Sequence, residues 1–270
     1  MRTEVTGHGG VRLALRVEGA RDGRPIVFVH GWAQASVAWA GQLSDPGLSG
    51  FRLVAMDLRG HGASDVPATG YDDPQVWADD LAAVLDFAGP DAIVVGWSYG
   101  GLVITDHIRV HGTARLSGIV LVGAVTEIGR DRPGGRVGPV MRDKLRALIS
   151  SDAGVAIPAL TEFAHRMPAN PLPGPQEQAL LGAALSTPPH VRAALFGRDI
   201  GSADVLAGID KPTLVVHGTA DGMIDPSAAD YALGKIPGAL GRWFADGGHL
   251  PFAESAAEFD AVLRRFAQEC

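Results

Sequence analysis

Short hydrophobic runs recur along the chain, and each is bounded by turn residues. In order they are Val11–Val17, Pro25–His30, Arg52–Leu58, Ala92–Trp97, Gly118–Ala124, Pro212–Gly218 and Gly241–Asp246. The middle runs are apolar at consecutive positions, which is typical of parallel strands covered by helices on both faces. Val11–Val17 alternates apolar and polar residues instead, which suits an antiparallel strand at a sheet edge.

Amphipathic helices are predicted between these runs. Hydrophobic residues recur at helical spacing in Gln75–Phe87 and again in Ser255–Phe266, while Leu102–Val110 follows a central run. Strands that alternate with helices indicate an α/β fold. We therefore expect a mostly parallel, doubly wound central sheet of about eight strands.

The segment 126–208 breaks this alternation, because no convincing strand lies in it. Helices are expected at Val137–Ile149, Thr161–Met167, Glu177–Leu185 and His190–Phe196, with a proline-rich turn at Met167–Pro175. We divide the chain into a core, 1–125 and 209–270, and a helical insertion, 126–208. The insertion is either a lid (cap) over a site or a set of ordinary surface helices.

Composition and charge narrow the class of protein. The 270 residues are 46% hydrophobic and 20% charged, which supports a sizeable core. The net charge is −7 and no basic patch stands out, so nucleic acid and anionic membrane surfaces are not expected partners. The single cysteine permits no intrachain disulfide, and no signal peptide or membrane-spanning run is recognisable. We expect a cytoplasmic protein.

One serine lies at a sharp junction between a predicted strand and a predicted helix. The stretch Gly96-Trp97-Ser98-Tyr99-Gly100 has the pattern G-x-S-x-G. Glycines two residues before and after such a serine let the backbones approach closely and leave its Oγ exposed. The following helix directs its N-terminal N–H groups at the same place. The alternative is a glycine-rich turn that holds an inert serine.

A serine nucleophile needs a base, and the base needs an orienting carboxylate. In this type of sheet the expected chain order is serine, acid, histidine. Among nine histidines, His249 is favoured, because it follows the last predicted strand in a Gly-Gly loop before the final helix. For the acid we prefer Asp221, close to the end of the preceding strand. Asp225 can instead cap a helix that begins at Pro226.

Acyl transfer also needs backbone N–H donors for the oxyanion of its transition state. Tyr99, which follows the serine, supplies one expected donor. The second is the N–H of Trp32, in the loop after the strand Pro25–His30. We expect His30 to hydrogen-bond locally and shape this loop, and the Trp32 ring to wall the pocket.

Five motifs occur in the order seen in the α/β-hydrolase superfamily: VFVHGW, MDLRGHGASD, GWSYGG, HGTADGMIDP and GGHLPFAESAAEF. The chain resembles this superfamily over nearly its whole length apart from the insertion. Within it, the chain resembles the serine esterases and cofactor-free haloperoxidase-like enzymes. The resemblance implies Ser98 as nucleophile, His249 as base and Asp221 as its partner, and it places 126–208 where the family has its cap domain.

The same resemblance separates structural from catalytic residues. It implies that Asp57 and His61, in the second motif, belong to a structural turn. Family members that remove halides or open epoxides carry aspartate at the nucleophile position, so Ser98 argues against both reactions.

The expected function is serine-dependent hydrolysis of a small to medium, apolar carboxylic ester, without cofactor or metal. No zinc-binding or phosphate-binding motif occurs in the sequence. Perhydrolysis, acyl transfer and carbon–carbon bond hydrolysis with the same triad are alternatives, as is a slow-turnover ligand-binding receptor. The intact Ser98, Asp221 and His249 disfavour the receptor. Both a monomer and a homodimer fit the sequence.

Overall fold

Eight strands form one sheet in the computed structural model, which describes residues 1–270. They are β1 (Arg2–Thr6), β2 (Arg12–Gly19), β3 (Pro25–Val29), β4 (Arg52–Met56), β5 (Ala92–Trp97), β6 (Leu116–Val122), β7 (Thr213–Gly218) and β8 (Leu240–Phe244). Their order is β1-β2-β4-β3-β5-β6-β7-β8, and all pairs are parallel except β1–β2 and β2–β4. The predicted α/β fold with a mostly parallel sheet is confirmed.

Strand burial follows the hydrophobic pattern. Every residue of β3, β5 and β7 is buried, as expected for strands covered on both faces. In β2, Leu13 and Leu15 are buried while their neighbours are not. The prediction that this strand forms the sheet edge is wrong, because β1 pairs along its outer side. Alternation reports that one face of a strand is covered, and it says nothing about how many neighbours the strand has.

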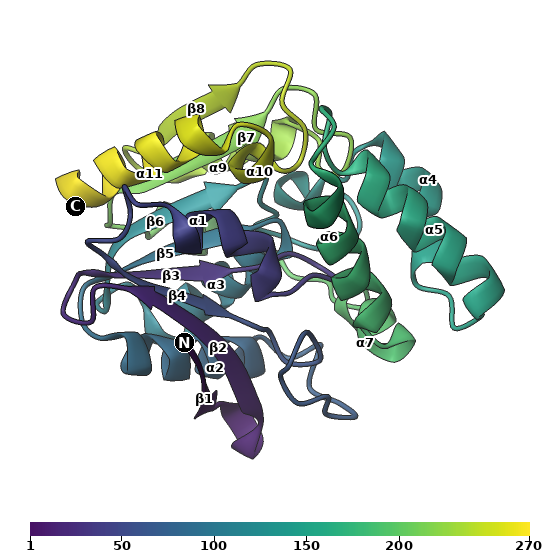
Figure 1. The fold of residues 1–270 in the computed structure, drawn as a ribbon, viewed down its shortest axis with the longest axis horizontal. Coiled ribbons are helices and arrows are strands. Elements are labelled where there is room, and N and C mark those ends of the chain that lie inside the picture. Colours follow the sequence, from purple (N-terminus) through teal and green to yellow (C-terminus); the bar gives the residue numbers. More distant parts are fainter.

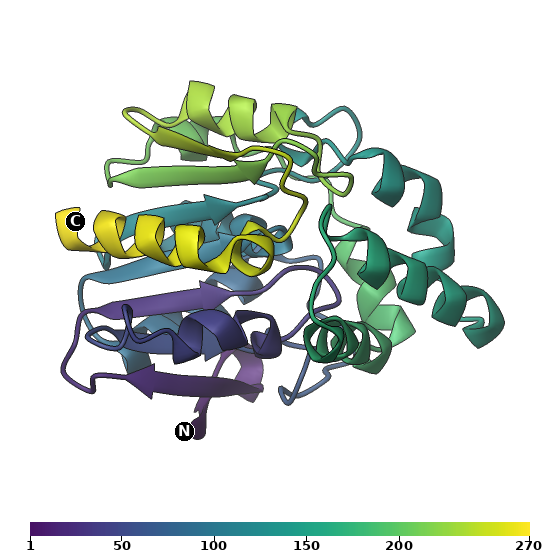
Figure 2. The same cartoon turned by 45° about the horizontal axis from the view of Figure 1, so that its top comes forward.

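Helices pack on both faces of the sheet (Figures 1 and 2). On one face, α2 (Pro74–Ala88) and α3 (Tyr99–His111) pack together, and α8 (Ala203–Ala207) joins α3 to α9 (Ser227–Lys235). On the other face lie α1 (Ala40–Ser44), α10 (Pro251–Glu254) and α11 (Ala256–Glu269). Short 3₁₀ turns occur at His8–Gly10, Ser36–Trp39 and Pro133–Gly135. None of the helices has the length and hydropathy that a membrane span requires.

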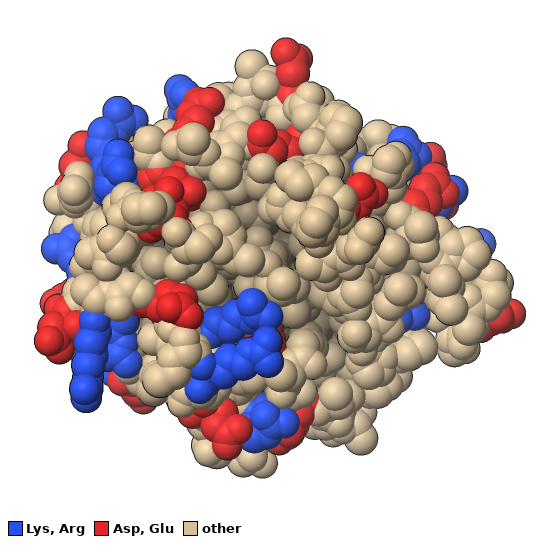
Figure 3. Space-filling view, in the orientation of Figure 1, with Lys and Arg blue, Asp and Glu red and all other residues tan.

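No strand lies between β6 and β7, where helices alternate with irregular segments that carry the isolated bridge Ile128–Ile200. Before α8, the helices are α4 (Pro139–Leu148), α5 (Ala153–Arg166), α6 (Gly174–Ser186) and α7 (Pro189–Leu195). In Figure 1 these four helices gather beyond one end of the sheet, and Figure 3 shows a mostly uncharged surface over them.

The helix α5 begins earlier than expected from the sequence. The Asp152 carboxylate caps its N-terminus by accepting the N–H of Gly154 at 2.8 Å. An internal proline usually ends or kinks a helix, yet Pro158 lies inside α5. Buried residues on both sides of it, Ala156 and Leu160, hold the helix against its neighbours. The expected start at Thr161 is wrong because burial and capping outweigh the proline.

Candidate active site

The three residues of the expected triad follow three strands of the sheet. Ser98 comes directly after β5, Asp221 comes shortly after β7, and His249 follows β8. Strands β5, β6, β7 and β8 are adjacent and parallel, so their carboxyl ends lie at the same edge. Ligands of open parallel sheets bind beyond that edge.

Ser98 sits in a strained turn between β5 and α3. Its backbone angles are φ 53° and ψ −118°, a conformation that residues other than glycine rarely adopt. The flanking glycines are required by close approach. A Cβ at Gly96 would lie 2.7 Å from the carbonyl carbon of Gly100, and a Cβ at Gly100 would lie 2.5 Å from the Val29 oxygen. The turn thus matches the expected strand-to-helix junction.

Asp221 and His249 form a buried hydrogen-bonded pair. His249 Nδ1 lies 2.8 Å from Asp221 Oδ2, and Asp221 Oδ1 accepts the N–H groups of Met223 and Ile224 at 2.8 and 3.0 Å. Burial by itself raises the pKa of Asp221, but the neighbouring His249 and the hydrogen bonds to the carboxylate lower it well below its usual range. Because an ionised carboxylate only accepts, Nδ1 of His249 carries a proton, and in the neutral form of the ring Nε2 is left with its lone pair.

No hydrogen bond joins His249 Nε2 to Ser98 Oγ in this structure, and neither atom has another protein partner. Both residues are adjacent to Gly123. A Cβ on Gly123 would lie 3.1 Å from His249 Nδ1, and the preceding Val122 accepts the Ser98 N–H at 3.0 Å. Catalytic hydrogen bonds are often long in ligand-free enzymes and shorten when substrate binds.

A second histidine lies against the same carboxylate. Nε2 of the buried His217 lies 3.1 Å from Asp221 Oδ2 and 3.2 Å from the Ile224 carbonyl oxygen. Both neighbours are acceptors, so this nitrogen carries a proton. The sequence predicts no role for His217. Its position four residues before Asp221 is the one sequence feature that relates the two residues.

Two backbone N–H groups are available beside Ser98. The N–H of Trp32 donates to no protein acceptor, and Tyr99 is the first residue of α3, where the helix provides none. A Cβ on Gly31 would lie 3.0 Å from the Ser98 Cβ, so the Trp32 loop abuts the serine. His30 holds this loop: its Nδ1 donates to the Gly31 oxygen at 2.8 Å, and its Nε2 accepts the Leu58 N–H at 2.9 Å.

A cavity of about 350 Å³ opens at Ser98. Its apolar lining comes from the core and from the insertion: Trp32, Val125, Ile128, Val137, Met141, Leu145, Phe196 and Ile224. The centroid of the Trp32 ring lies 5.5 Å from that of Phe163 and 5.4 Å from that of Phe196. Larger hollows of about 690 and 840 Å³ lie elsewhere and contain none of the expected site residues.

A buried ion pair contributes to the wall of this cavity through Arg198. Nη2 of Arg198 is 2.7 Å from Asp106 Oδ2, and Nη1 donates to the Tyr99 hydroxyl at 3.0 Å. The side chains of Arg198 and Asp106 are 1% and 0% exposed. Burial raises the pKa of Asp106 to about 6 although the Arg198 charge lowers it. The sequence did not indicate this pair, because its members are far apart in the chain.

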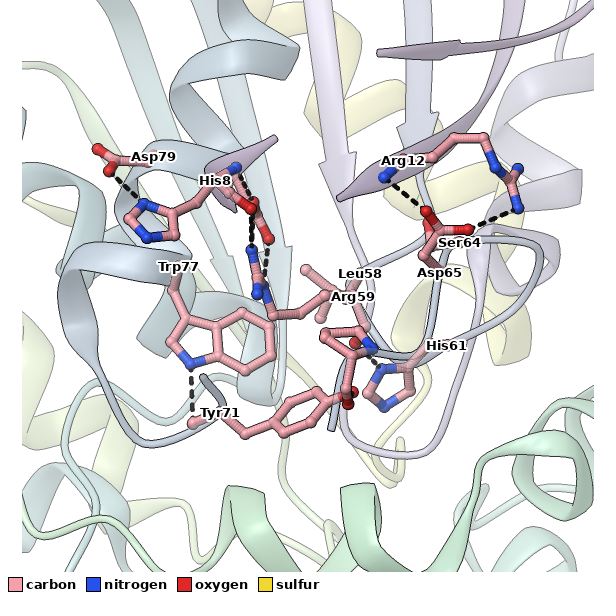
Figure 4. Close-up of polar contacts among 12 residues, drawn as sticks. His8, Arg12, Leu58, Arg59, His61, Ser64, Asp65, Tyr71, Trp77 and Asp79 are labelled. Atoms are coloured by element: carbon pink, nitrogen blue, oxygen red, sulfur yellow. Dashed lines mark hydrogen bonds and ion pairs between the residues drawn. The ribbon is translucent and has the colours of Figure 1, made fainter. Parts of the chain in front are cut away.

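Several residues of catalytic type have structural roles, among them His61 and Arg59, which Figure 4 shows in the turn after β4. Asp57 accepts the N–H groups of Ser36 and Ala63 at 2.6 and 2.9 Å, and His61 Nδ1 bonds the Arg59 carbonyl at 2.9 Å. Arg59 makes a two-pronged contact with Asp80 at 2.6 and 2.7 Å. These bonds brace the turn after β4. No group of three or more histidine, cysteine, aspartate or glutamate side chains is arranged to hold a metal ion.

Comparison with known proteins decides the family. Residues 26–262 match the model of the alpha/beta hydrolase family. The chain belongs to this family. This alpha/beta hydrolase is 44% identical to an esterase from Rhodococcus sp. ECU1013, with 98% of each chain covered and a TM-score of 0.90.

Two further relatives show the same branch. A putative aryl esterase from Burkholderia cenocepacia is 30% identical, with a TM-score of 0.92, and the comparison covers 100% of this chain and 98% of the other. A non-heme chloroperoxidase from Streptomyces lividans is 30% identical over 241 residues, which are 82% of each chain. The expected resemblance to the esterase and haloperoxidase-like branch is confirmed, and a hydrolase is the activity class that these relatives support.

Proposed function

We propose that this alpha/beta hydrolase is a serine-dependent carboxylic ester hydrolase that acts on a small to medium, apolar ester. The observation that carries the proposal is the Asp221–His249 pair, whose unpartnered Nε2 lies on the same sheet edge as the strained Ser98. The lining of the cavity at Ser98 is mainly apolar, although Glu127, Arg130, Arg198 and Asp199 also line it, and this supports an apolar acyl or alcohol group. The esterase from Rhodococcus sp. ECU1013 supports the reaction class.

Acylation would begin when Ser98 Oγ attacks the ester carbonyl carbon and His249 Nε2 accepts its proton. The N–H groups of Trp32 and Tyr99 would donate to the oxyanion that forms on the former carbonyl oxygen. His249 would then give its proton to the leaving alkoxide, which departs as an alcohol. The ionised Asp221 would hold Nδ1–H in place and stabilise the transient imidazolium.

Deacylation would repeat these steps with water as the nucleophile. His249 Nε2 would accept a proton from water, the water oxygen would attack the acyl carbon, and Ser98 Oγ would leave with the proton. The carboxylic acid would be released and the serine regenerated. No further group is needed to balance either half of the reaction.

We also propose that the insertion 126–208 acts as the cap of the site. Met141, Leu145 and Phe196 of the insertion line the cavity. Other apolar residues of the insertion, such as Leu148 and Leu195, are buried against their neighbours, and Leu185 is exposed. The cap would therefore set the size of the acceptable acyl group through a few side chains.

The test is steady-state hydrolysis of p-nitrophenyl esters from acetate to decanoate. We expect turnover with a preference for one acyl length, and loss of that turnover in Ser98→Ala. Ser49→Ala, which changes an exposed serine in a turn, is the matched control and should retain the wild-type rate. Equal turnover by wild type and Ser98→Ala would contradict the proposal.

Perhydrolysis is the second candidate, because a non-heme chloroperoxidase is among the relatives that match at 30% identity. Hydrogen peroxide would replace water as the nucleophile in deacylation, so that the acyl group leaves Ser98 as a peracid. Peracid yield from an ester in the presence of peroxide, compared between wild type and Ser98→Ala, separates the two outcomes. Acid alone at saturating peroxide would reject perhydrolysis and leave ester hydrolysis in place.

A further inference from the structure

Backbone hydrogen bonds fix the loop that carries His249 at three consecutive residues, Gly248 to Leu250. The His249 N–H donates to the Met167 carbonyl oxygen at 2.9 Å, and the His249 carbonyl oxygen accepts the Trp97 Nε1–H at 2.9 Å. On either side of His249, the N–H groups of Gly248 and Leu250 donate to Glu254. The imidazole is thus positioned by its neighbours in the loop as well as by Asp221.

The Glu254 carboxylate accepts four backbone N–H groups from two separate segments. From the His249 loop come Gly248 at 2.9 Å and Leu250 at 3.0 Å. From the insertion come Ala169 at 2.9 Å and Asn170 at 3.1 Å. A carboxylate that satisfies several amides at once forms charge-assisted bonds, which are shorter and stronger than neutral ones.

Two more contacts tie the same segments together. The Asn170 side chain donates to the Asp246 carbonyl oxygen at 3.1 Å. A Cβ on Gly248 would lie 2.9 Å from the Met167 oxygen, so the two backbones touch without room for a side chain. The proline-rich stretch between α5 and α6 is therefore a direct neighbour of the His249 loop.

We propose that Glu254 is a positioning residue that fixes His249 by joining its loop to Met167–Asn170 of the insertion. This inference rests on the proposed function, in which His249 is the base. The insertion then has two roles, because it lines the cavity and also holds the catalytic histidine in place. We call the contacts of Glu254 with both segments the Glu254 joint. Since misplacement of a catalytic group by about 1 Å can cost about 100-fold in rate, loss of the Glu254 joint should lower turnover.

Glu254 does not line the cavity, so its loss should change catalysis and leave substrate binding alone. In Glu254→Ala all four N–H groups lose their acceptor. In Glu254→Gln one side-chain oxygen still accepts backbone N–H groups. The amide NH₂ replaces the other oxygen and faces backbone N–H donors, with which it cannot bond. We expect kcat to fall about 10- to 100-fold in Glu254→Ala and less in Glu254→Gln, with KM within about threefold of wild type.

The rates are measured per active site, by titrating Ser98 with a p-nitrophenyl phosphonate, so that unfolded protein does not count. Asp45→Ala is the control, because Asp45 also accepts a backbone N–H, that of Leu48 at 3.1 Å, in a turn that contributes nothing to the cavity. It should change stability but leave kcat per site unchanged. A merely structural role for Glu254 would give the same result as this control and would overturn the inference.

Amide hydrogen exchange tests the joint independently of activity. In Glu254→Ala, peptides that contain Gly248–Leu250 and Ala169–Asn170 should both exchange faster than in wild type and in Asp45→Ala. Unchanged protection of Ala169–Asn170 would overturn the inference even if turnover falls. If wild type shows no ester turnover above Ser98→Ala, the proposed function fails, whereas faster exchange in both segments still supports the joint.

Discussion

Loss of Arg198 from its buried ion pair with Asp106 should destabilise the folded protein. Arg198→Met leaves the Asp106 carboxylate without its ion-pair partner in a site where the Asp106 side chain is 0% exposed and Oδ1 already has no hydrogen-bond partner. Removing one member of a buried pair costs about 3–5 kcal/mol of unfolding free energy. For a chain of this size that corresponds to a drop in Tm of roughly 6–20 °C.

A double variant separates the pair from the space that it fills. Replacing both charges by apolar residues, in Arg198→Met with Asp106→Leu, removes the stranded carboxylate. Such replacements are often neutral or stabilising, so we expect the double variant to be more stable than Arg198→Met by about 2 kcal/mol or more. Arg166→Met, which removes an exposed pair with Glu162, is the control and should cost less than about 1 kcal/mol.

The loss of unfolding free energy in Arg198→Met, relative to wild type, should depend on pH in one direction. Burial raises the pKa of Asp106 to about 6 in the folded protein, above the value of about 3.9 for an unfolded chain. The folded state therefore binds this proton more tightly, and the cost of the carboxylate grows as pH rises from about 4 to about 6. Without Arg198 the pKa rises further, so the deficit of Arg198→Met should be larger at about pH 8 than at about pH 5.

Urea unfolding at about pH 5 and about pH 8, followed by tryptophan fluorescence, gives the unfolding free energies of wild type, Arg198→Met and the double variant and their dependence on pH. The prediction is refuted if Arg198→Met lies within about 1 kcal/mol of wild type at the higher pH, or if the double variant is less stable than Arg198→Met. A deficit that does not change with pH would show that the lost packing of the arginine, and not the stranded charge, sets the cost.

Three further predictions concern the triad, a buried histidine and the cavity. Asp221→Asn should lower kcat by about 10⁴-fold because it allows the wrong tautomer of His249. Asp225→Asn, whose amide oxygen can still accept the Ser227 N–H, should retain wild-type turnover, and equal losses would contradict the assignment. Burial, together with the neighbouring His30, lowers the pKa of His61 to about 3, so the folded protein loses stability as pH falls below about 6.5 and the unfolded chain takes up the proton more readily. The unfolding free energy of wild type minus that of His61→Gln should therefore fall by up to about 1.4 kcal/mol per pH unit. A constant difference from about pH 7 to about pH 4 would refute this. Met141→Ala should shift the preferred p-nitrophenyl ester toward longer acyl chains because Met141 lines the cavity, and an unchanged preference would place the acyl group elsewhere.

Features that depend on local pattern were predictable from the sequence. Consecutive apolar residues identified the buried strands β3, β5 and β7, and the glycines around Ser98 identified the strand-to-helix turn. The helix after Asp225 was expected to begin at Pro226, and it begins one residue later, at Ser227; the Asp225 carboxylate accepts the Ser227 N–H, but the capping position is Pro226. In each case the physical cause lies within a few residues of the feature.

Features that depend on contacts between distant segments were not predictable. The strand β1 was not placed at the sheet edge, because pairing with β2 leaves no mark on the alternation in β2 itself. Arg198 and Asp106 lie 92 residues apart, and Glu254 reaches Ala169 across 85 residues. With one sequence, nothing couples such positions until the chain is folded.

Covalent labelling tests whether Ser98 is the nucleophile of an ester hydrolase. Wild type is treated with a p-nitrophenyl alkylphosphonate while p-nitrophenol release and residual ester hydrolysis are followed, and the labelled peptide is identified by mass spectrometry. We predict one equivalent of p-nitrophenol, complete loss of ester hydrolysis, the added mass on the peptide that contains Ser98, and no labelling of Ser98→Ala. Ester hydrolysis that survives the reagent with Ser98 unmodified, or that continues undiminished in Ser98→Ala, would contradict the account.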